Sequence, residues 1–244
     1  MSYFISSFVA PRNNWRKDEY GGPIENRARI LVNIIKGIRQ GTRPDFVIGL
    51  RITAEDGLPD GLTPQDYADV AKLAEAAGAD YISLAYGVYE TMSMGVGTKD
   101  GGMAHDGSSK TFKDTLSIPV MIQGIHDPER IAQAIAGGQG DLAMLARPLL
   151  ADPNYPNKVK TGRQNEIVVC DRDHLCMRRM IFGMPVRCSM NPAMGREARI
   201  EKGEGRPLKR YLAAPKEWLI LKLTSSKTFM TPVMKLVRKV LAMS

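Results

Sequence analysis

The sequence is poor in the features that mark several large classes of protein. It has 244 residues but only three cysteines, so it cannot form the disulfide framework of a small secreted domain. No apolar run approaches the ~20 residues that cross a bilayer. No charged and apolar leader segment opens the chain. We therefore expect a cytoplasmic protein whose cysteines stay reduced, lying at most on a membrane surface.

An excess of basic charge is also missing from most of the chain. Residues 1–200 hold 24 basic and 23 acidic side chains, whereas residues 201–244 hold 10 and 3. A nucleic-acid binder is expected to carry its basic charge on the folded domain. We therefore expect no nucleic-acid partner. The content of 43% hydrophobic and 25% charged residues excludes a disordered chain and predicts a globular protein.

From residue 24 onward, helical periodicity alternates with short apolar runs, which is typical of βαβ units and a parallel sheet. The pattern predicts helices over residues 24–40, 63–77 and 127–137, and strands over 45–51, 81–85, 118–122 and 141–145. The glycine-rich, polar segment 86–113 is too irregular for a simple connection and predicts a functional loop. The fold class is therefore α/β.

Ligands of parallel α/β folds gather at the carboxyl ends of the strands. Those ends carry Arg51, the 86–113 loop, Gly124 and Arg147, so we expect these groups along one edge of the sheet. A complete eight-unit barrel takes about 250 residues. Only four strand-helix units are visible, so the sequence predicts an incomplete barrel.

A dense polar motif precedes the first long helix. It consists of Phe8, Pro11, Asn14, Arg16, Asp18, Tyr20, Gly21, Gly22, Glu25, Asn26 and Arg27. This pattern strongly resembles the old yellow enzyme family, in which F-x-x-P-x-x-N-x-R-x-D-x-Y-G-G-x-x-E-N-R follows the fourth barrel strand. The resemblance extends over residues 1–197. It implies the C-terminal half of a TIM (β/α)8 barrel, with a partial FMN-binding domain over residues 1–162.

The same resemblance implies the residues that bind FMN. Arg51 corresponds to the family's fifth-strand arginine, whose cation stabilises the anionic reduced flavin. Gln123, Gly124, Ala146 and Arg147 correspond to the phosphate-binding ends of strands seven and eight, where backbone N–H groups hold the anion. Ala146 replaces a usual glycine, which is tolerable unless the position needs a positive φ. Without the resemblance, the sequence indicates only that Arg51 lies at the end of a strand and forms a surface ion pair.

The resemblance also implies catalytic residues. Tyr3 falls where the motif H-x-x-H-x-Y places a tyrosine that protonates the substrate, although Met1 stands at the second histidine position. The alternative for Tyr3 is a frayed terminal aromatic. His105 corresponds to a loop histidine of the dienoyl-CoA reductase-like branch that donates to a substrate carbonyl. The alternative for His105 is an exposed loop side chain.

Three cysteines lie in a further segment, residues 163–200. Cys170, Cys176 and Cys188 resemble the C-x2-C-x3-C-x11-C motif that binds a four-iron cluster in the dienoyl-CoA reductase-like branch. Asp173 takes the place of the second ligand, and one residue is absent before Cys176. An iron–sulfur cluster that uses Asp173 or His174 is therefore the less favoured reading, and ordinary buried thiols are the alternative.

The tail, residues 201–244, predicts a basic amphipathic helix. Met230, Val233, Met234, Val237 and Leu241 share one face, with basic residues largely opposite. Such a helix suits a membrane surface, but more often it packs on its own domain, which is the reading we prefer.

The resemblance implies an FMN-dependent NAD(P)H:flavin oxidoreductase, an ene-reductase that takes hydride from NADH or NADPH. Its substrate would be a small α,β-unsaturated carbonyl compound, an enone or enoyl thioester. One alternative is a truncated, inactive half-barrel whose free strand edges need a partner chain or a second copy of the chain. A membrane-surface adaptor acting through the tail is another.

Overall fold

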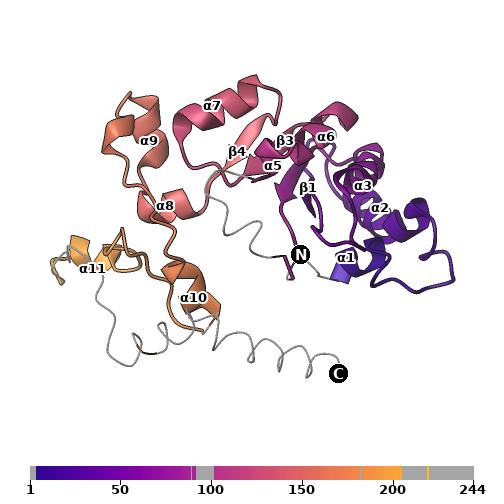
Figure 1. Ribbon diagram of the computed structural model, residues 1–244, viewed down its shortest axis with the longest axis horizontal. Helices are drawn as coiled ribbons and strands as arrows, with labels where there is room; N and C mark the ends of the chain where they lie inside the picture. Colours follow the sequence, from indigo (N-terminus) through magenta and orange to yellow (C-terminus); the bar gives the residue numbers. More distant parts are fainter. Residues whose placement is uncertain (1–3, 89, 92–101, 182, 205–218, 220–244) are drawn as a thin grey trace. The chain divides into compact units, whose positions relative to one another are not determined.

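The computed structural model of the chain describes residues 4–88, 90–91, 102–181, 183–204 and 219 (Figure 1). The chain divides into two compact units, residues 1–145 and 146–244. The boundary near residue 162 that the motifs suggest separates functional regions and stays a prediction. We describe each unit by itself.

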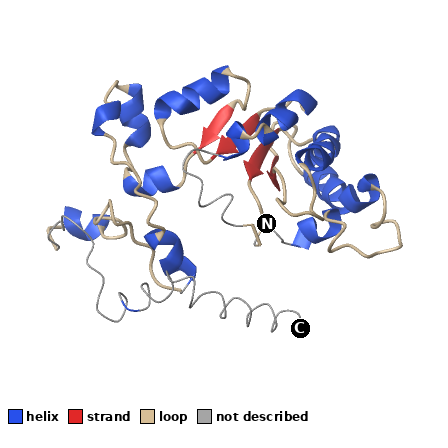
Figure 2. Ribbon diagram, viewed as in Figure 1, coloured by secondary structure: helices blue, strands red, loops and turns tan. Residues whose placement is uncertain are grey.

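The first unit is built on a four-stranded parallel sheet with the strand order β1-β2-β3-β4 (Figure 2). The strands are β1 (Gly49–Thr53), β2 (Tyr81–Ala85), β3 (Val120–Gln123) and β4 (Leu142–Met144). Each is joined to the next by a segment that contains at least one helix, so successive strands are neighbours. The predicted α/β fold is confirmed, and its four parallel units form half of a TIM barrel.

The described helices of this unit are α1 (Phe4–Val9), α2 (Ile24–Gly41), α3 (Pro64–Ala76), α5 (Gly102–His105), α6 (Ser108–Thr115) and α7 (Pro128–Ala136). The sequence periodicity predicts α2, α3 and α7, whereas α1, α5 and α6 were not predicted. Figure 1 shows α2 and α3 side by side, and α3 also packs against α6. Together with α5, these helices provide the layer that covers one face of the sheet.

Side-chain caps set the start of two of these helices. The Thr63 hydroxyl accepts a hydrogen bond from the Asp66 backbone N–H, and the Asp66 carboxylate accepts one from the Thr63 N–H, which completes a capping box before α3. Asp127 caps α7 by accepting from the Arg130 N–H. Pro64 and Pro128 follow at the first helical position, where no N–H is needed.

The two faces of the sheet have different surroundings. Ile52, Ile82, Leu84, Val120 and Ile122 point to the helix-covered face, and all are 9% exposed or less. Neighbouring positions in each strand point the other way, because successive side chains of a strand alternate. On that opposite face Arg51 and Leu142 are exposed, and Met121, Gln123 and Met144 are only half-buried. Parallel sheets are ordinarily covered on both faces, so a face left open by the described residues of this unit is unusual.

The structure differs from the sequence prediction at two places in this unit. The first strand spans Gly49–Thr53 and not residues 45–51, because its partner β2 begins only at Tyr81, opposite Gly49. Arg51 therefore lies in the middle of β1 and not at its end. The 86–113 segment is not a continuous loop, because it contains α5 and the start of α6, which the fully buried Phe112 anchors in the core.

The described part of the second unit consists of short helices and the segments that join them. The helices are α8 (Arg147–Ala151), α9 (Tyr155–Lys160), α10 (Leu175–Ile181) and α11 (Glu197–Glu201), with a 3-10 turn over Gln164–Glu166. Asp152 organises the first part of this unit, since its buried carboxylate accepts hydrogen bonds from Lys158 Nζ at 2.7 Å and from the Val168 N–H at 2.9 Å. None of the helices in the described ranges is both long and apolar enough to cross a membrane.

Candidate functional site

The polar motif before α2 folds into a hydrogen-bonded turn. Asn14 Nδ2 donates to the carbonyl oxygens of Phe8 and Tyr20 at 2.6 and 2.7 Å, and Arg27 Nε donates to the Val9 carbonyl at 2.8 Å. The Arg16 guanidinium lies 5.8 Å from the centre of the Phe8 ring and 5.7 Å from that of Tyr20. These contacts tie both ends of the turn together. Within this unit the motif residues therefore position the chain that leads into α2.

Arg51 is the centre of a polar cluster on the open face of the sheet. Its Nη2 donates to Gln123 Oε1 at 3.0 Å, and its Nη1 lies 3.1 Å from Met144 Sδ and 3.4 Å from Ser83 Oγ. The cluster thus joins all four strands. It brings Arg51 into contact with Gln123, which was predicted from a separate motif, and the cofactor-binding roles of both stay predictions.

The charge of Arg51 is not neutralised within its cluster. Its three partners are an amide oxygen, a thioether and a hydroxyl, all of them uncharged. Among the described residues no carboxylate pairs with it, so the ion pair considered for Arg51 is not formed there. A guanidinium held in place by neutral acceptors can stabilise a negative charge placed against the open face.

The remaining residues predicted to bind the cofactor have suitable backbones. Gly124 directly follows Gln123 and has φ +99°, which a glycine adopts without strain. Ala146 has φ −120°, so alanine in place of the family's usual glycine causes no strain there. Ala146 directly precedes α8, and Arg147 is the first residue of that helix, in the second unit.

The two predicted catalytic residues receive no structural test. Tyr3 lies outside the described residues. The backbone of His105 ends α5, and its side chain lies outside the described part. Both roles remain predictions.

The structure gives no direct test of the iron–sulfur cluster predicted for the three cysteines. All are free thiols, and the described residues contain no group of three or more histidine, cysteine, aspartate or glutamate side chains arranged to hold a metal. Burial raises the pKa of the Cys176 and Cys188 thiols, which opposes the thiolate form that ligates iron. Their role as ligands therefore stays a prediction without geometric support.

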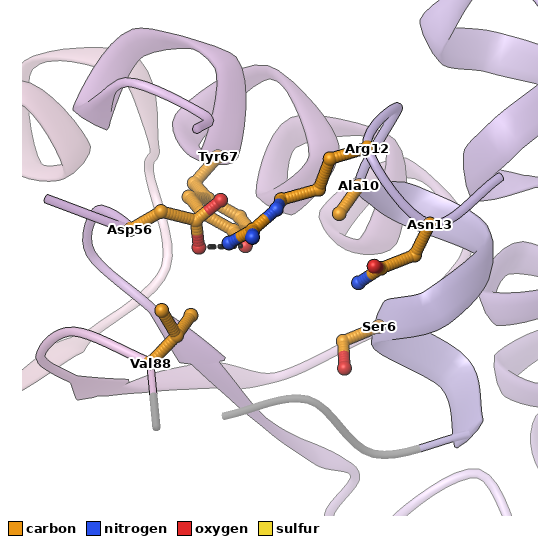
Figure 3. Close-up of a pocket in the computed structure, with 7 residues that line it drawn as sticks. All are labelled: Ser6, Ala10, Arg12, Asn13, Asp56, Tyr67 and Val88. Atoms are coloured by element: carbon orange, nitrogen blue, oxygen red, sulfur yellow. Dashed lines mark hydrogen bonds between the residues drawn. The ribbon is translucent and has the colours of Figure 1, made fainter. Parts of the chain in front are cut away.

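A small cavity in the first unit lies apart from the Arg51 cluster. Figure 3 shows Arg12 reaching toward Asp56 and Tyr67, whose hydroxyl donates to Asp56 Oδ1 at 2.8 Å. Burial and the Asp56 charge raise the pKa of Tyr67. The volume of about 10 Å³ admits one water molecule. This cavity is therefore too small to be the cofactor site, and the Asp56–Tyr67 pair has a structural role.

Sequence reasoning missed two members of the Arg51 cluster. Ser83 lies directly opposite Arg51 in the β1–β2 register, and Met144 lies opposite Gln123 in the β3–β4 register. The signal was present in principle, because residues paired in register across parallel strands share a face. It needed the correct strand bounds, which the apolar runs alone did not supply.

These features of the fold and of the site define a class of protein. The chain contains four parallel β/α units, with a cation at the open face of the sheet and a positive-φ glycine after the third strand. Half of a TIM barrel has this architecture, with ligand-binding groups supplied by several strands.

The sequence profile of the NADH:flavin oxidoreductase / NADH oxidase family matches residues 1–166, and the chain belongs to this family. The cofactors of the family are FMN and NAD(P)H. The resemblance to the old yellow enzyme family is thereby confirmed.

Similar proteins have several redox activities. NADH oxidase from Thermoanaerobacter brockii is 33% identical over 214 residues, which are 85% of this chain and 33% of that protein. Cinnamate reductase from Clostridium sporogenes is 29% identical, over 86% of this chain and 34% of the reductase. The solved structure of a 2-naphthoyl-CoA reductase complex is similar to this chain, with 32% sequence identity and a TM-score of 0.72. The match covers 80% of this chain and 30% of the reductase chain. The chain thus spans about a third of the length of these relatives.

Proposed function

We propose that this chain supplies the C-terminal, flavin-binding half of an FMN-dependent ene-reductase. Arg51 carries this proposal, because its uncompensated cation is held at the open face of the sheet in a member of a flavin-dependent family. The cinnamate and 2-naphthoyl-CoA reductases among its relatives favour a conjugated carbonyl substrate. NADH or NADPH would be the reductant.

Five of the predicted site residues would have defined tasks. Bound FMN would supply the hydride chemistry of the family. Arg51 would stabilise negative charge on the reduced flavin, and Gln123 would hold the guanidinium in its bound orientation. Gly124 would allow the backbone to approach the cofactor closely. Tyr3 and His105 would serve the substrate, as proton donor and carbonyl ligand.

Flavin binding and turnover test this proposal. The purified chain is incubated with FMN, freed of excess flavin by gel filtration, and examined for the flavin absorption band. We expect retained FMN, and anaerobic NADH oxidation that depends on an added enone such as cinnamaldehyde. A colourless protein that takes up no FMN would overturn the proposal for this chain.

Among the described residues, β1 and β4 are the outer strands of the sheet, and this supports a second candidate, in which the chain works only with a partner. Phe46 and Val47, just before edge strand β1, are 46% and 65% exposed, and Leu142 on edge strand β4 is 48% exposed. Exposed apolar groups beside unpaired strand edges are typical of surfaces that another chain covers. Light scattering distinguishes the cases: a stable monomer that binds FMN would remove the need for a partner.

A further inference from the structure

Helix α2 carries two apolar stripes, and the fold of the first unit buries only one of them. The buried stripe faces the core and contains Leu31 and Ile35. The other stripe is exposed along its length, and its members follow the i, i+3, i+4, i+7 spacing of one helix face: Ile34, Gly37, Ile38 and Gly41. A Cβ atom placed on either of these glycines would meet nothing within 4 Å. A second helix can therefore approach the exposed stripe closely.

Helix α7 carries a similar stripe. None of its residues is buried, and Ala132, Ile135 and Ala136 are exposed at the i, i+3, i+4 spacing of one face. A different face of the helix packs against the core through Ile131 and Ala134. The exposed stripes of α2 and α7 thus have the same character, because each combines isoleucine with small residues and contains no charge.

Each of these helices directly precedes an outer strand of the described sheet. Helix α2 is followed by β1, and α7 is followed by β4, so the two stripes belong to opposite edges (Figure 1). Phe46 and Val47 before β1 and Leu142 on β4 are exposed as well. Natural proteins protect free edges with lysine or proline, and neither β1 nor β4 contains one. Both edges are therefore suited to pairing with another strand.

The two edges complement each other. A parallel β/α sheet closes into a barrel at eight strands, and the described sheet has four. A two-fold axis along such a barrel keeps all the strands parallel and places β4 of each copy beside β1 of the other. The same rotation places α2 of each copy beside α7 of the other. A different partner would need two edges that match β1 and β4, whereas a second copy already has both.

We propose that two copies of this chain pair the edges of their first units and close an eight-stranded barrel. The proposal names the partner of the second candidate function, on which it rests, and it does not depend on flavin binding. Helices α2 and α7 both run back toward the start of the strand that follows them, so their last turns lie at the same end of the barrel. Ile38 of one copy is therefore expected near Ile135 of the other.

Light scattering of the full chain over a range of protein concentrations tests the proposal. Ile38→Lys and Ile135→Glu each place one charge in a stripe that the pair would bury. We expect a wild-type dimer, and a dissociation constant about a hundredfold higher in each variant, because a buried charge without a partner is costly. Val169→Lys is the matched control and should leave the dimer unchanged, since Val169 is 66% exposed but lies in the second unit.

A mixture of the two single variants guards against misfolding. In a mixed pair, the introduced cation of one chain lies beside the introduced carboxylate of the other at one junction, and the second junction keeps the wild-type residues. The mixture should therefore regain the mass of a dimer, as should the double variant Ile38→Lys/Ile135→Glu. Misfolded chains would not recover in this way.

The open face of the sheet gives a second measurement. Met121 is half-buried in the separate chain, and the closed pair would enclose it. The loss of stability caused by Met121→Ala should therefore be smallest in dilute protein and should grow as the protein concentration rises. A loss that is the same at all concentrations would contradict the closed pair.

The outcomes separate this proposal from flavin binding. A monomeric wild type, oligomers that keep growing with concentration, or a dimer that neither charged variant weakens would overturn the proposed pair. A monomer that retains FMN would overturn the pair and leave the flavin-binding function standing. A dimer that responds to the variants as expected but takes up no FMN would support the pair and contradict the flavin-binding function.

Discussion

The two faces of the sheet in the first unit show how the same strands serve stability and function. The helix-covered face carries Ile82, Leu84 and Val120, each fully buried. The open face carries Arg51 and Gln123, which are polar and accessible. Burial of apolar groups stabilises the fold, whereas an exposed cation in a fixed position is available to a ligand. The alternation of side chains along each strand separates the two tasks.

The largest expected effect is on the covered face. Leu84→Ala removes a fully buried side chain in β2 and leaves a cavity, which should lower the free energy of unfolding by about 3 kcal/mol. Urea denaturation followed by circular dichroism measures the change.

Met121→Ala is the matched substitution on the open face, since Met121 is only half-buried. We expect it to cost about 1 kcal/mol or less, because the side chain loses fewer contacts. Equal losses for Leu84→Ala and Met121→Ala would show that the open face is covered in solution.

An effect below that of Leu84→Ala is expected for the buried polar pair of Tyr67 and Asp56. Tyr67→Phe removes the hydroxyl that donates to Asp56 and leaves that carboxylate, 1% exposed, with the Leu62 N–H as its remaining described donor. We expect a loss of about 1–3 kcal/mol in unfolding free energy. Thermal unfolding measures it, and an unchanged melting temperature would mean that water replaces the hydroxyl at no cost.

A further effect, which depends on pH, concerns Glu75 of α3, whose carboxylate accepts hydrogen bonds from Ser117 and Ile118 just before β3. Burial alone would raise the pKa of Glu75, but hydrogen bonds from Lys72 and Ser117 outweigh it and hold that pKa at about 2. The carboxylate therefore contributes stability that is present above its unfolded pKa, near 4.5, and is lost as the pH falls toward 2.

The Glu75→Gln variant should lose this part of the acid dependence. Unfolding free energies measured between pH 5 and pH 2 should fall less steeply in the variant than in the wild type. Parallel curves would show that Glu75 is not held in its charged form by these bonds.

The sequence alone predicts the long helices better than the bounds of the strands. Periodicity and caps located α2, α3 and α7 because these signals are local, as at Thr63 and Asp127. The bounds of β1 depend on where β2 begins, which is a long-range contact that no local pattern reports. The Arg51–Gln123 contact could be anticipated from the family resemblance. The contacts of Ser83 and Met144 with Arg51 could not, because they depend on the register of the strands.

The reduction potential of bound FMN tests most directly whether Arg51 on the open face serves a flavin. Arg51→Met removes the charge at similar side-chain length, and Arg51→Lys retains it. Because a nearby cation stabilises the anionic reduced flavin, we predict a more negative potential in Arg51→Met than in the wild type, with Arg51→Lys between them. Equal potentials in all three proteins would contradict this account of the Arg51 cluster.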